Sequence, residues 1–458
     1  MAKKFDAIII GAGQAGPSLA GRLTGAGMKV ALVERKLFGG TCVNTGCMPT
    51  KALVACAYAA HLARRGSDYG VMIGDIAIDM KRVQARAETV RTNARTNVEK
   101  WLRGMDGLTV IEGHARFESS DTIRVGDELL TAPRIFINVG GRANVPDMPG
   151  IGDVDYLTNT SILDLDTLPE HLVVIGGSYI GLEFAQMYRR FGAQVTVVEM
   201  GPRLVGREDE DVSDAVRTIL EDEGIEIRTD AECISFARHA QGVAVGVDCT
   251  AGAPQVIGSH VLLAIGRVPN THDLGLEKAG IATDARGYIT VDELLQTNVP
   301  GIWAMGDCNG RGAFTHTAYN DFEIIAANLL DGADRKLSER ILGYALYIDP
   351  PLGRVGIGEA EARRSGRPIL VAKRPMTRVG RAVEKDETKG FMKVIVDAGT
   401  KRILGATILG TGGDEAIHGV LDAMNMDAPY PTLQWAVPIH PTVSELIPTV
   451  LGDLKPAD

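Results

Sequence analysis

Cysteine is scarce in this chain, with six among 458 residues. That is too few to hold so long a chain together as a secreted disulfide scaffold, and it favours a cytoplasmic protein. The apolar run at residues 7–10 is too short for a signal-peptide core, and no run approaches the roughly 20 residues of a membrane span. The net charge is −10 and basic residues form no concentrated stripe, so nucleic acid and membrane partners are not expected.

Glycine, by contrast, is abundant, with 54 residues. This suits a protein built on tight turns and on close approach of backbone to ligands. Hydrophobic residues make 45% of the chain and charged residues 23%, which is an ordinary globular composition. The length predicts about three domains.

Two of the cysteines, Cys42 and Cys47, lie in the stretch 39–51 with four residues between them. A strand pattern at 31–34 precedes this stretch, and good helix formers fill 51–61. The pair therefore lies where a loop enters a helix, and there the helix dipole favours the thiolate form. We predict a redox-active disulfide. The alternative is that both are small buried hydrophobic residues, and the spacing by itself leaves both open.

The N-terminus carries a dinucleotide-binding fingerprint in its required context. A buried strand at 7–10 leads into Gly11, Gly13 and Gly16, then a helix to Gly25 and a second strand that ends on Glu34. The glycines allow a tight turn, backbone approach to a pyrophosphate and close helix packing, and the carboxylate suits a ribose hydroxyl.

The same unit recurs in the middle of the chain. A strand at 173–175 leads into Gly176, Ser178 and Gly181, and a helix and a strand then reach Glu199. From Gly11 to Glu34 is 23 positions, and from Gly176 to Glu199 is 23 again. Two nucleotide sites in one chain indicate electron transfer between two cofactors. Ser178 replaces the middle glycine, so a pyrophosphate is expected slightly farther from the backbone.

The acidic residue of the second unit bears on the choice of nucleotide. Glu199 favours a free 2′-hydroxyl, because a carboxylate repels a 2′-phosphate, so NADH is favoured over NADPH. Arg203 and Arg207 follow closely and weaken this inference.

A third repeat marks two joints. Residues 139–146 and 265–269 each close an apolar strand on glycine, arginine and proline. We interpret them as the crossings into and out of an inserted domain at about 151–270. A strand then ends in the turn Gly306-Asp307, and 315–330 is predicted to be helical.

The remaining segments carry weaker signals. Residues 60–105 are predicted to hold a long helical stretch with many arginines and alanines and a solvated face. From Gly343 onward the pattern changes to strands such as 391–396 and 403–409. Near the end, His440 precedes Glu445 by five residues, and an imidazole oriented by a carboxylate is a candidate proton acceptor. The alternative is a structural histidine.

Taken in this order, the two fingerprints, the cysteine pair, the Gly-Asp turn and the His440–Glu445 tail resemble the flavin-dependent pyridine nucleotide–disulfide oxidoreductases over essentially the whole chain. The cysteine stretch is closest in wording to mercuric reductase-like members, with dihydrolipoamide dehydrogenase-like members as the other model. The resemblance implies an α/β fold with two Rossmann-like domains and an α+β C-terminal dimerisation domain. It places an FAD-binding domain at 1–150 and 271–342, an NAD(P)-binding domain at 151–270 and the dimerisation domain at 343–458.

The resemblance also implies roles for individual residues. Cys47 would face the flavin and Cys42 the substrate, with Lys51 and Glu183 as an ion pair beside the flavin and Tyr179 as an aromatic gate over the nicotinamide. His440 and Glu445 would be an acid–base pair supplied by the partner subunit of a homodimer. The cofactor-binding residues expected for FAD and NAD(P)H are Gly11, Gly13, Gly16, Glu34, Thr41, Gly306, Asp307, Gly176, Ser178, Tyr179, Gly181, Glu199 and Gly266.

The implied reaction passes electrons between NAD(P)H and a dithiol or disulfide through flavin and the Cys42–Cys47 disulfide, in either direction. A metal-ion reductase on the same scaffold is the close alternative, although the C-terminal tail lacks the vicinal cysteines of mercuric reductases. A redox-sensing or NAD(P)H oxidase-type flavoprotein is a more distant one. No resident metal site is expected, and Cys56, Cys233, Cys249 and Cys308 are predicted to be structural.

Overall fold

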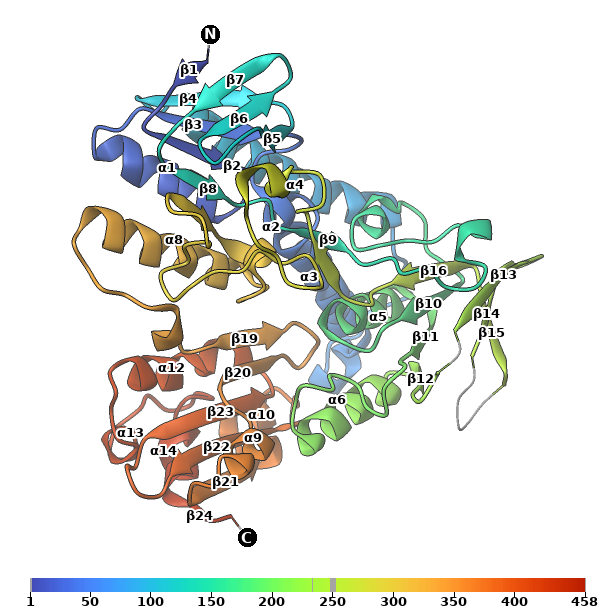
Figure 1. Ribbon diagram of the computed structural model, residues 1–458. Helices are drawn as coiled ribbons and strands as arrows, with labels where there is room; N and C mark the ends of the chain where they lie inside the picture. The colour runs from blue at the N-terminus through green and yellow to red at the C-terminus, as the bar shows by residue number, and fades with distance from the viewer. Residues whose placement is uncertain (1, 233, 248–252, 458) are drawn as a thin grey trace.

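The computed structural model describes residues 2–232, 234–247 and 253–457 (Figure 1). Its first sheet has five parallel strands in the order β18-β8-β2-β3-β4. The central strand β2 reads Ala-Ile-Ile-Ile and is buried throughout, as expected where both faces of a parallel sheet are covered. The members are β2 (Ala7–Ile10), β3 (Val30–Glu34), β4 (Leu108–Glu112), β8 (Ile135–Ile137) and β18 (Ile302–Ala304), with α1 (Ala15–Gly25) and α8 (Thr315–Leu330) among the helices packed beside them.

A second parallel sheet has the order β12-β11-β10-β16 and repeats the strand–helix–strand unit of the first. Its strands are β10 (His171–Ile175), β11 (Gln194–Val198), β12 (Glu226–Arg228) and β16 (His260–Leu263), accompanied by α5 (Tyr179–Phe191) and α6 (Glu210–Asp222). Both predicted nucleotide-binding units therefore fold as the sequence indicates, which confirms two Rossmann-like sheets.

The two Gly-Arg-Pro segments lie side by side. β9 (Gly141–Ala143) pairs antiparallel with β17 (Arg267–Pro269), so the chain leaves and re-enters the first sheet through adjacent strands. Strands β8 and β18, which lie before and after this excursion, are neighbours in one sheet. These pairings support an inserted domain, and the bounds given above stay a prediction.

The C-terminal part is a sheet in which every pairing is antiparallel, in the order β19-β20-β23-β22-β21-β24. Figure 1 shows it in orange and red beside the chain's C-terminus. Its strands are β19 (Gly343–Leu346), β20 (Leu352–Gly356), β21 (Ile369–Pro375), β22 (Phe391–Asp397), β23 (Ile403–Leu409) and β24 (Lys455–Pro456). The change to a strand pattern at Gly343 is thus confirmed, and the bounds of the C-terminal domain stay a prediction.

Residues 60–105 hold a long helix, as expected, but helices do not fill the whole range. Two helices, α3 (Cys47–Arg64) and α4 (Met80–Arg103), are separated by the short 3-10 helix η1 (Gly66–Tyr69) and an irregular segment. Gly70 has φ +74°, which ends the helical path because β-carbon-bearing residues disfavour that conformation. The alanine-rich face of α3 packs into the same core as α5.

The remaining elements complete the layers without carrying predicted site residues, apart from α2 and the 3-10 helix η4 (Gly306–Asn309), which holds Gly306 and Asp307. Two small sheets are formed by β1 (Lys3–Lys4), β5 (Ala115–Phe117), β6 (Thr122–Val125) and β7 (Glu128–Thr131), and by β13 (Ser235–His239), β14 (Gly242–Gly246) and β15 (Gln255–Gly258). Short helices are α2 (Gly40–Asn44), α7 (Leu276–Ala279), α9 (Glu359–Arg364), α10 (Gly380–Glu384), α11 (Gly413–Ala416), α12 (His418–Asn425), α13 (Pro431–Gln434) and α14 (Leu446–Gly452). Within the described ranges, no helix is long and apolar enough to cross a bilayer.

Candidate functional site: a thiol pair between two nucleotide folds

The thiol pair lies on two consecutive helices. Cys42 belongs to α2, and Cys47 is the first residue of α3. A side chain at Gly40 would place its Cβ 2.8 Å from the Cα of Gly13, so only glycine lets α2 dock on the first fingerprint turn. Figure 1 shows α2 and α3 near the centre of the molecule. The sequence thus folds so that the cysteines sit beside a nucleotide-binding turn.

The two thiols have opposite acidities. A hydrogen bond from Cys42, followed by the Thr315 hydroxyl and the positive charge of Lys51, outweighs burial and lowers the pKa of Cys47 to about 6. The same bond to Cys47, together with burial, raises the pKa of Cys42 well above its ordinary value. In the reduced pair, Cys47 therefore carries the negative charge and Cys42 keeps its proton at neutral pH.

Lys51 and Glu183 meet as predicted. The Lys51 ammonium donates to the Glu183 carboxylate at 2.7 Å, and the side chain of Glu183 is buried. The second carboxylate oxygen of Glu183 accepts from the backbone amide of Tyr347 at 3.0 Å. Helices α3 and α5 are thereby joined next to Cys47, where the ion pair sets the local charge.

The first fingerprint forms a cradle that side chains would fill. Gly11 has φ +106°, and a Cβ there would lie 2.3 Å from the carbonyl oxygen of Asn138. A Cβ at Gly16 would lie 2.3 Å from the Gly11 carbonyl oxygen. Glu34 accepts from the amide of Ala12 at 2.8 Å, so its carboxylate lies against the turn. This geometry fits the ADP half of FAD.

The second fingerprint repeats this geometry. Gly176 has φ +110°, and a Cβ at Gly181 would lie 2.1 Å from the Gly176 carbonyl oxygen. Glu199 accepts from the amide of Gly177 at 2.6 Å, as Glu34 does from Ala12 in the first unit. Ser178 is exposed at the N-cap of α5 and makes no side-chain cap. Its hydroxyl is free to face a pyrophosphate.

Thr41 and Asp307 are brought together by a residue that was not predicted as a site residue. Arg267 donates to the Thr41 hydroxyl at 3.3 Å, and its Nε lies 3.5 Å from a carboxylate oxygen of Asp307. Burial raises the pKa of Asp307 despite this arginine. Gly266 and Gly306 both have positive φ beside these side chains, at +97° and +71°. The sequence showed Arg267 only as part of a crossing segment.

His440 and Glu445 form the predicted pair, but on the surface. The Nδ1 atom of His440 lies 2.9 Å from Glu445 Oε2, and the His440 side chain is 80% exposed. Among the residues described, no hydrogen bond or ion pair joins His440 to either thiol of the same chain. Trp435, Val437 and Ile439 beside it are exposed and apolar, which is typical of a surface covered by a partner.

Of the other four cysteines, the two that the structure describes do not join the site. Cys308 is buried, and burial raises its pKa to about 12. Cys56 contacts the guanidinium of Arg86 at 3.8 Å. Both are consistent with structural roles, whereas Cys233 and Cys249 lie outside the described residues.

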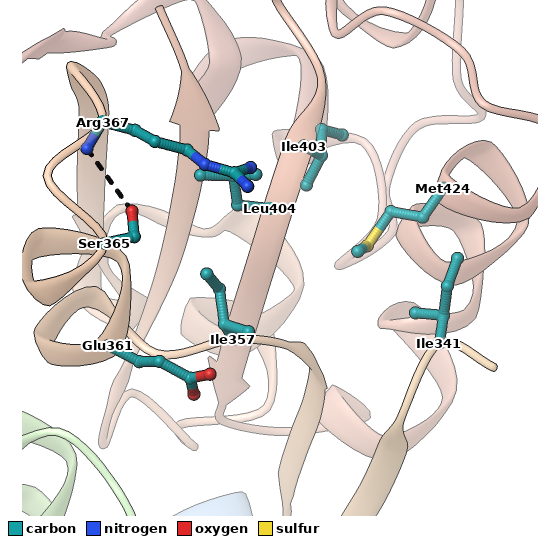
Figure 2. Close-up of a pocket in the computed structure, with 8 residues that line it drawn as sticks. All are labelled: Ile341, Ile357, Glu361, Ser365, Arg367, Ile403, Leu404 and Met424. Carbon is teal, nitrogen blue, oxygen red and sulfur yellow. Dashed lines mark hydrogen bonds between the residues drawn. The ribbon is translucent and has the colours of Figure 1, made fainter. Parts of the chain in front are cut away.

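A cavity of about 480 Å³ lies elsewhere, in the C-terminal sheet region. Figure 2 shows its lining, in which Ile357 and Met424 form apolar walls and the Arg367 guanidinium reaches in from the rim. It is lined by no thiol and no imidazole.

Comparison with known proteins decides the family. The family model described as "Pyridine nucleotide-disulphide oxidoreductase" matches residues 5–321. The model of that family's dimerisation domain matches residues 343–451. This chain belongs to that family. The predicted fold class, the enzyme class and the dependence on FAD and a pyridine nucleotide are thereby confirmed.

Three relatives are similar to this chain over most of their length. The chain is 37% identical, over 99% of its length and all of the relative, to "Probable pyridine nucleotide-disulfide oxidoreductase RclA" of Escherichia coli (strain K12). It is 34% identical to a mercuric reductase of Streptomyces lividans, over 90% of this chain and 88% of that one. It is 31% identical to a dihydrolipoyl dehydrogenase of Thermus scotoductus, over 97% and 96%.

A solved structure covers the same length. "Cu(II) complex of HOCl-induced flavoprotein disulfide reductase RclA from Escherichia coli" superposes with a TM-score of 0.89 at 36% identity, covering 99% of each chain. The members of this family that the chain resembles are flavoprotein disulfide reductases, which confirms the main functional prediction at that level.

Proposed function

We propose that this chain reduces a small disulfide with electrons from NAD(P)H, using Cys42 and Cys47 as its redox-active pair. The observation that supports this is the placement of the pair: Cys47 is the first residue of α3, its sulfur lies 3.5 Å from the Thr315 hydroxyl, and the Lys51–Glu183 ion pair lies one helical turn further on. A stable thiolate at Cys47 suits the sulfur that faces the flavin. A protonated Cys42 suits the sulfur that attacks substrate only after a base removes its proton.

The bound FAD supplies two-electron transfer between the nicotinamide and the thiol pair. The Gly11–Gly16 turn, Glu34, Thr41 and Asp307 would hold it, with Arg267 as an added contact. Lys51 and Glu183 would keep the charge beside it fixed. Glu199, whose carboxylate is held at the second turn by the amides of Gly177 and Gly201, supports a preference for NADH.

The base that Cys42 needs is the imidazole of His440. Because His440 is exposed and its neighbours are apolar, we place it across a homodimer interface, oriented by Glu445 and facing the Cys42 of the partner. The family's dimerisation domain supports this assembly. We also propose a cytoplasmic location, where a reversible thiol pair is kept reduced.

The proposed reaction at the sulfur atoms is a proton transfer followed by two thiol–disulfide exchanges. His440 takes the Cys42 proton, and the thiolate attacks one sulfur of the substrate disulfide to form a mixed disulfide. The leaving thiolate takes that proton back from His440. Cys47 next attacks the Cys42 sulfur, which closes the Cys42–Cys47 disulfide and releases the second substrate sulfur as a thiolate.

A soft metal ion is the second candidate substrate. The E. coli relative is described as a Cu(II) complex, and mercuric reductases are also among the relatives. Thiolates are soft ligands that bind such ions. Among the described residues, no group of three or more His, Cys, Asp or Glu side chains could hold a metal, so the ion would meet the thiol pair itself.

An anaerobic titration of the holoenzyme with NADH tests the proposal. We expect a long-wavelength absorbance band on reduction, which Cys47→Ser abolishes. Cys42→Ser is the matched control, because it leaves the Cys47 thiolate in place and should show the band before any NADH is added. Immediate full bleaching of the flavin without the band in the wild type would contradict the assignment.

A substrate panel then separates the two candidates. Turnover is measured with dihydrolipoamide, glutathione disulfide, Hg(II) and Cu(II), each with NADH and NADPH or their oxidised forms. Fast turnover of a disulfide supports the leading proposal. Turnover of metal ions alone supports the second, and equal catalytic efficiency with NADPH would refute the nucleotide preference.

A further inference from the structure

Glu208 is a buried carboxylate with three side-chain partners. Its side chain is fully buried, at 0% exposure. One carboxylate oxygen accepts from the hydroxyls of Tyr179 at 2.9 Å and Tyr344 at 2.8 Å. The other accepts from the Arg354 guanidinium at 2.8 Å. Neither the family resemblance nor the sequence patterns assign a role to this residue.

The contacts join three parts of the chain. Tyr179 lies within the second fingerprint and Glu208 just before α6. Tyr344 and Arg354 belong to β19 and β20 of the C-terminal sheet. Phe314, just before α8, stacks on Tyr344 with ring centroids 5.5 Å apart and meets Tyr179 edge-on at 6.4 Å. Tyr344 also meets Tyr179 edge-on, at 5.5 Å. The Tyr179 ring is therefore held by one hydrogen bond and two ring contacts.

The Glu208 carboxylate is held in place by other contacts, so it cannot move together with the Tyr179 ring. The Arg354 side chain is only 4% exposed. The next residue, Asp209, accepts from the amides of Glu359 and Ala360 at 2.9 and 3.0 Å and pairs with Lys393 at 2.8 Å. The start of α6 is thus fixed to the C-terminal sheet, and a displaced Tyr179 would lose its hydrogen bond.

We propose that Glu208 is a positioning residue that tethers Tyr179 over the nicotinamide pocket, so that NAD(P)H binds only when the Tyr179–Glu208 bond breaks. This rests on the proposed function and on the family resemblance, which implies that Tyr179 covers that pocket. The closed tether lowers the apparent affinity for the nucleotide by the fraction of molecules in which the ring is released. Burial, reinforced by the charge of Glu208, raises the pKa of Tyr179, which keeps the hydroxyl a donor.

Two variants of the holoenzyme, each lacking one tyrosine hydroxyl, test the tether. Tyr179→Phe removes the tethered hydroxyl and keeps the ring. Tyr344→Phe removes the other hydroxyl on the same carboxylate oxygen and leaves Tyr179 bonded. The readouts are the Kd for NAD⁺ by calorimetry and the NADH concentration dependence of flavin reduction by stopped flow.

Tyr179→Phe is expected to tighten NAD⁺ binding about tenfold, as loss of a hydrogen bond to a charged acceptor predicts. Tyr344→Phe is expected to leave the Kd within about twofold or to weaken it, because Tyr179 then has the oxygen to itself. Glu208→Gln should tighten binding less than Tyr179→Phe, since an amide still accepts, and its thermal unfolding is measured in parallel.

The outcomes separate the tether from the function. An unchanged Kd in Tyr179→Phe, or equal tightening in both tyrosine variants, overturns the tether even if the wild type is active. A wild type that reduces disulfides but fails the Cys47→Ser test overturns the thiol assignment and leaves the tether standing. A wild type that binds no NAD⁺ overturns both. If Glu208→Gln does not fold, the two tyrosine variants still decide.

Discussion

The sulfur of Cys47 lies 3.5 Å from the hydroxyl oxygen of Thr315, although 268 residues separate them in sequence. Thr315 is the first residue of α8, so the contact brings a helix N-terminus from the first Rossmann-like part to the thiol. A hydroxyl donated to a thiolate stabilises the charged form. The low pKa of Cys47 therefore depends partly on a residue far outside the cysteine stretch.

Thr315→Val should raise the pKa of Cys47 above about 6, by roughly one unit for a lost hydrogen bond to a charged group. Because the thiolate exists above the pKa, the long-wavelength absorbance of the reduced holoenzyme should appear at higher pH. A pH titration of that absorbance measures the shift. Thr315→Ser keeps the hydroxyl and should titrate like the wild type; a valine variant that also does so would refute the contact's role.

Lys51 and Glu183 should shift the same titration in opposite directions. Lys51 lowers the pKa of Cys47 and Glu183 raises it. Lys51→Met is therefore expected to move the Cys47 midpoint to higher pH, and Glu183→Gln to lower pH, each by about half a unit at a partly solvated site. Shifts of the same sign in both variants would show that the ion pair acts through structure and not through charge.

The stability of the two variants should differ as well. Lys51→Met leaves the buried Glu183 carboxylate without its cation, while Glu183→Gln leaves a lysine that is one-third exposed and can reach water. Thermal unfolding should therefore show the larger loss for Lys51→Met, on the order of 2 kcal/mol after allowance for solvent. The reverse order would be evidence against burial of the carboxylate.

His440→Ala should separate proton transfer from electron transfer. We expect disulfide turnover to fall by about 10² to 10³, in line with loss of a general acid–base group. Reduction of an artificial quinone, which needs no proton at sulfur, should change less than about twofold. Steady-state assays with both acceptors on one preparation measure this, and equal losses would contradict the proton role.

Glu445→Gln should have a milder effect than His440→Ala. The amide can still hydrogen-bond His440 at its Nδ1 atom, which now lies 2.9 Å from the carboxylate. It cannot stabilise the positive imidazolium, so disulfide turnover should fall less than in His440→Ala. A larger loss than in His440→Ala would mean that Glu445 acts elsewhere.

Much of the fold follows from local sequence pattern. Strands such as Ala7–Ile10 and Gln194–Val198 and the helix Thr315–Leu330 have the predicted bounds, because their apolar runs and glycine turns lie within a few residues of one another. The pairing of Lys51 with Glu183 came from the family resemblance and not from pattern, since 132 residues separate the two.

The remaining contacts needed the tertiary structure. Arg267 at Asp307, Thr315 at Cys47 and Glu208 at Tyr179 each join elements that no period or motif relates. The exact ends of the helices within 60–105 were not predicted, for a related reason. Its arginine- and alanine-rich composition has helical propensity throughout, and the breaks near Gly66 and Gly70 are local backbone choices that an averaged pattern hides.

Lys393 should prove essential to the stability of the contact between α6 and the C-terminal sheet. Its side chain is 1% exposed and its ammonium pairs with Asp209 and Asp211 at 2.8 Å and with Glu359 at 3.3 Å. Lys393→Met leaves three clustered carboxylates without their central cation. The thermal midpoint is expected to fall by roughly 10 °C at pH 7. Lys373→Met is the matched control, because Lys373 binds Asp211 from a largely exposed position, and it should cost less than about 3 °C.

The loss of thermal stability in Lys393→Met should depend on pH and should be smaller in acid than at pH 7. Burial opposes ionisation of Asp209 and Asp211, but Lys393, with Lys373 at Asp211 and backbone amides at Asp209, outweighs it and lowers both pKa values in the folded wild type. Such groups stabilise the fold above their unfolded pKa, and that contribution is lost as the pH falls through the folded value. In the variant the carboxylates lose this cation, so acid relieves their repulsion. The difference in thermal midpoint between wild type and Lys393→Met should therefore shrink from pH 7 toward pH 4, and a difference that grows in acid would refute the charge cluster as its cause.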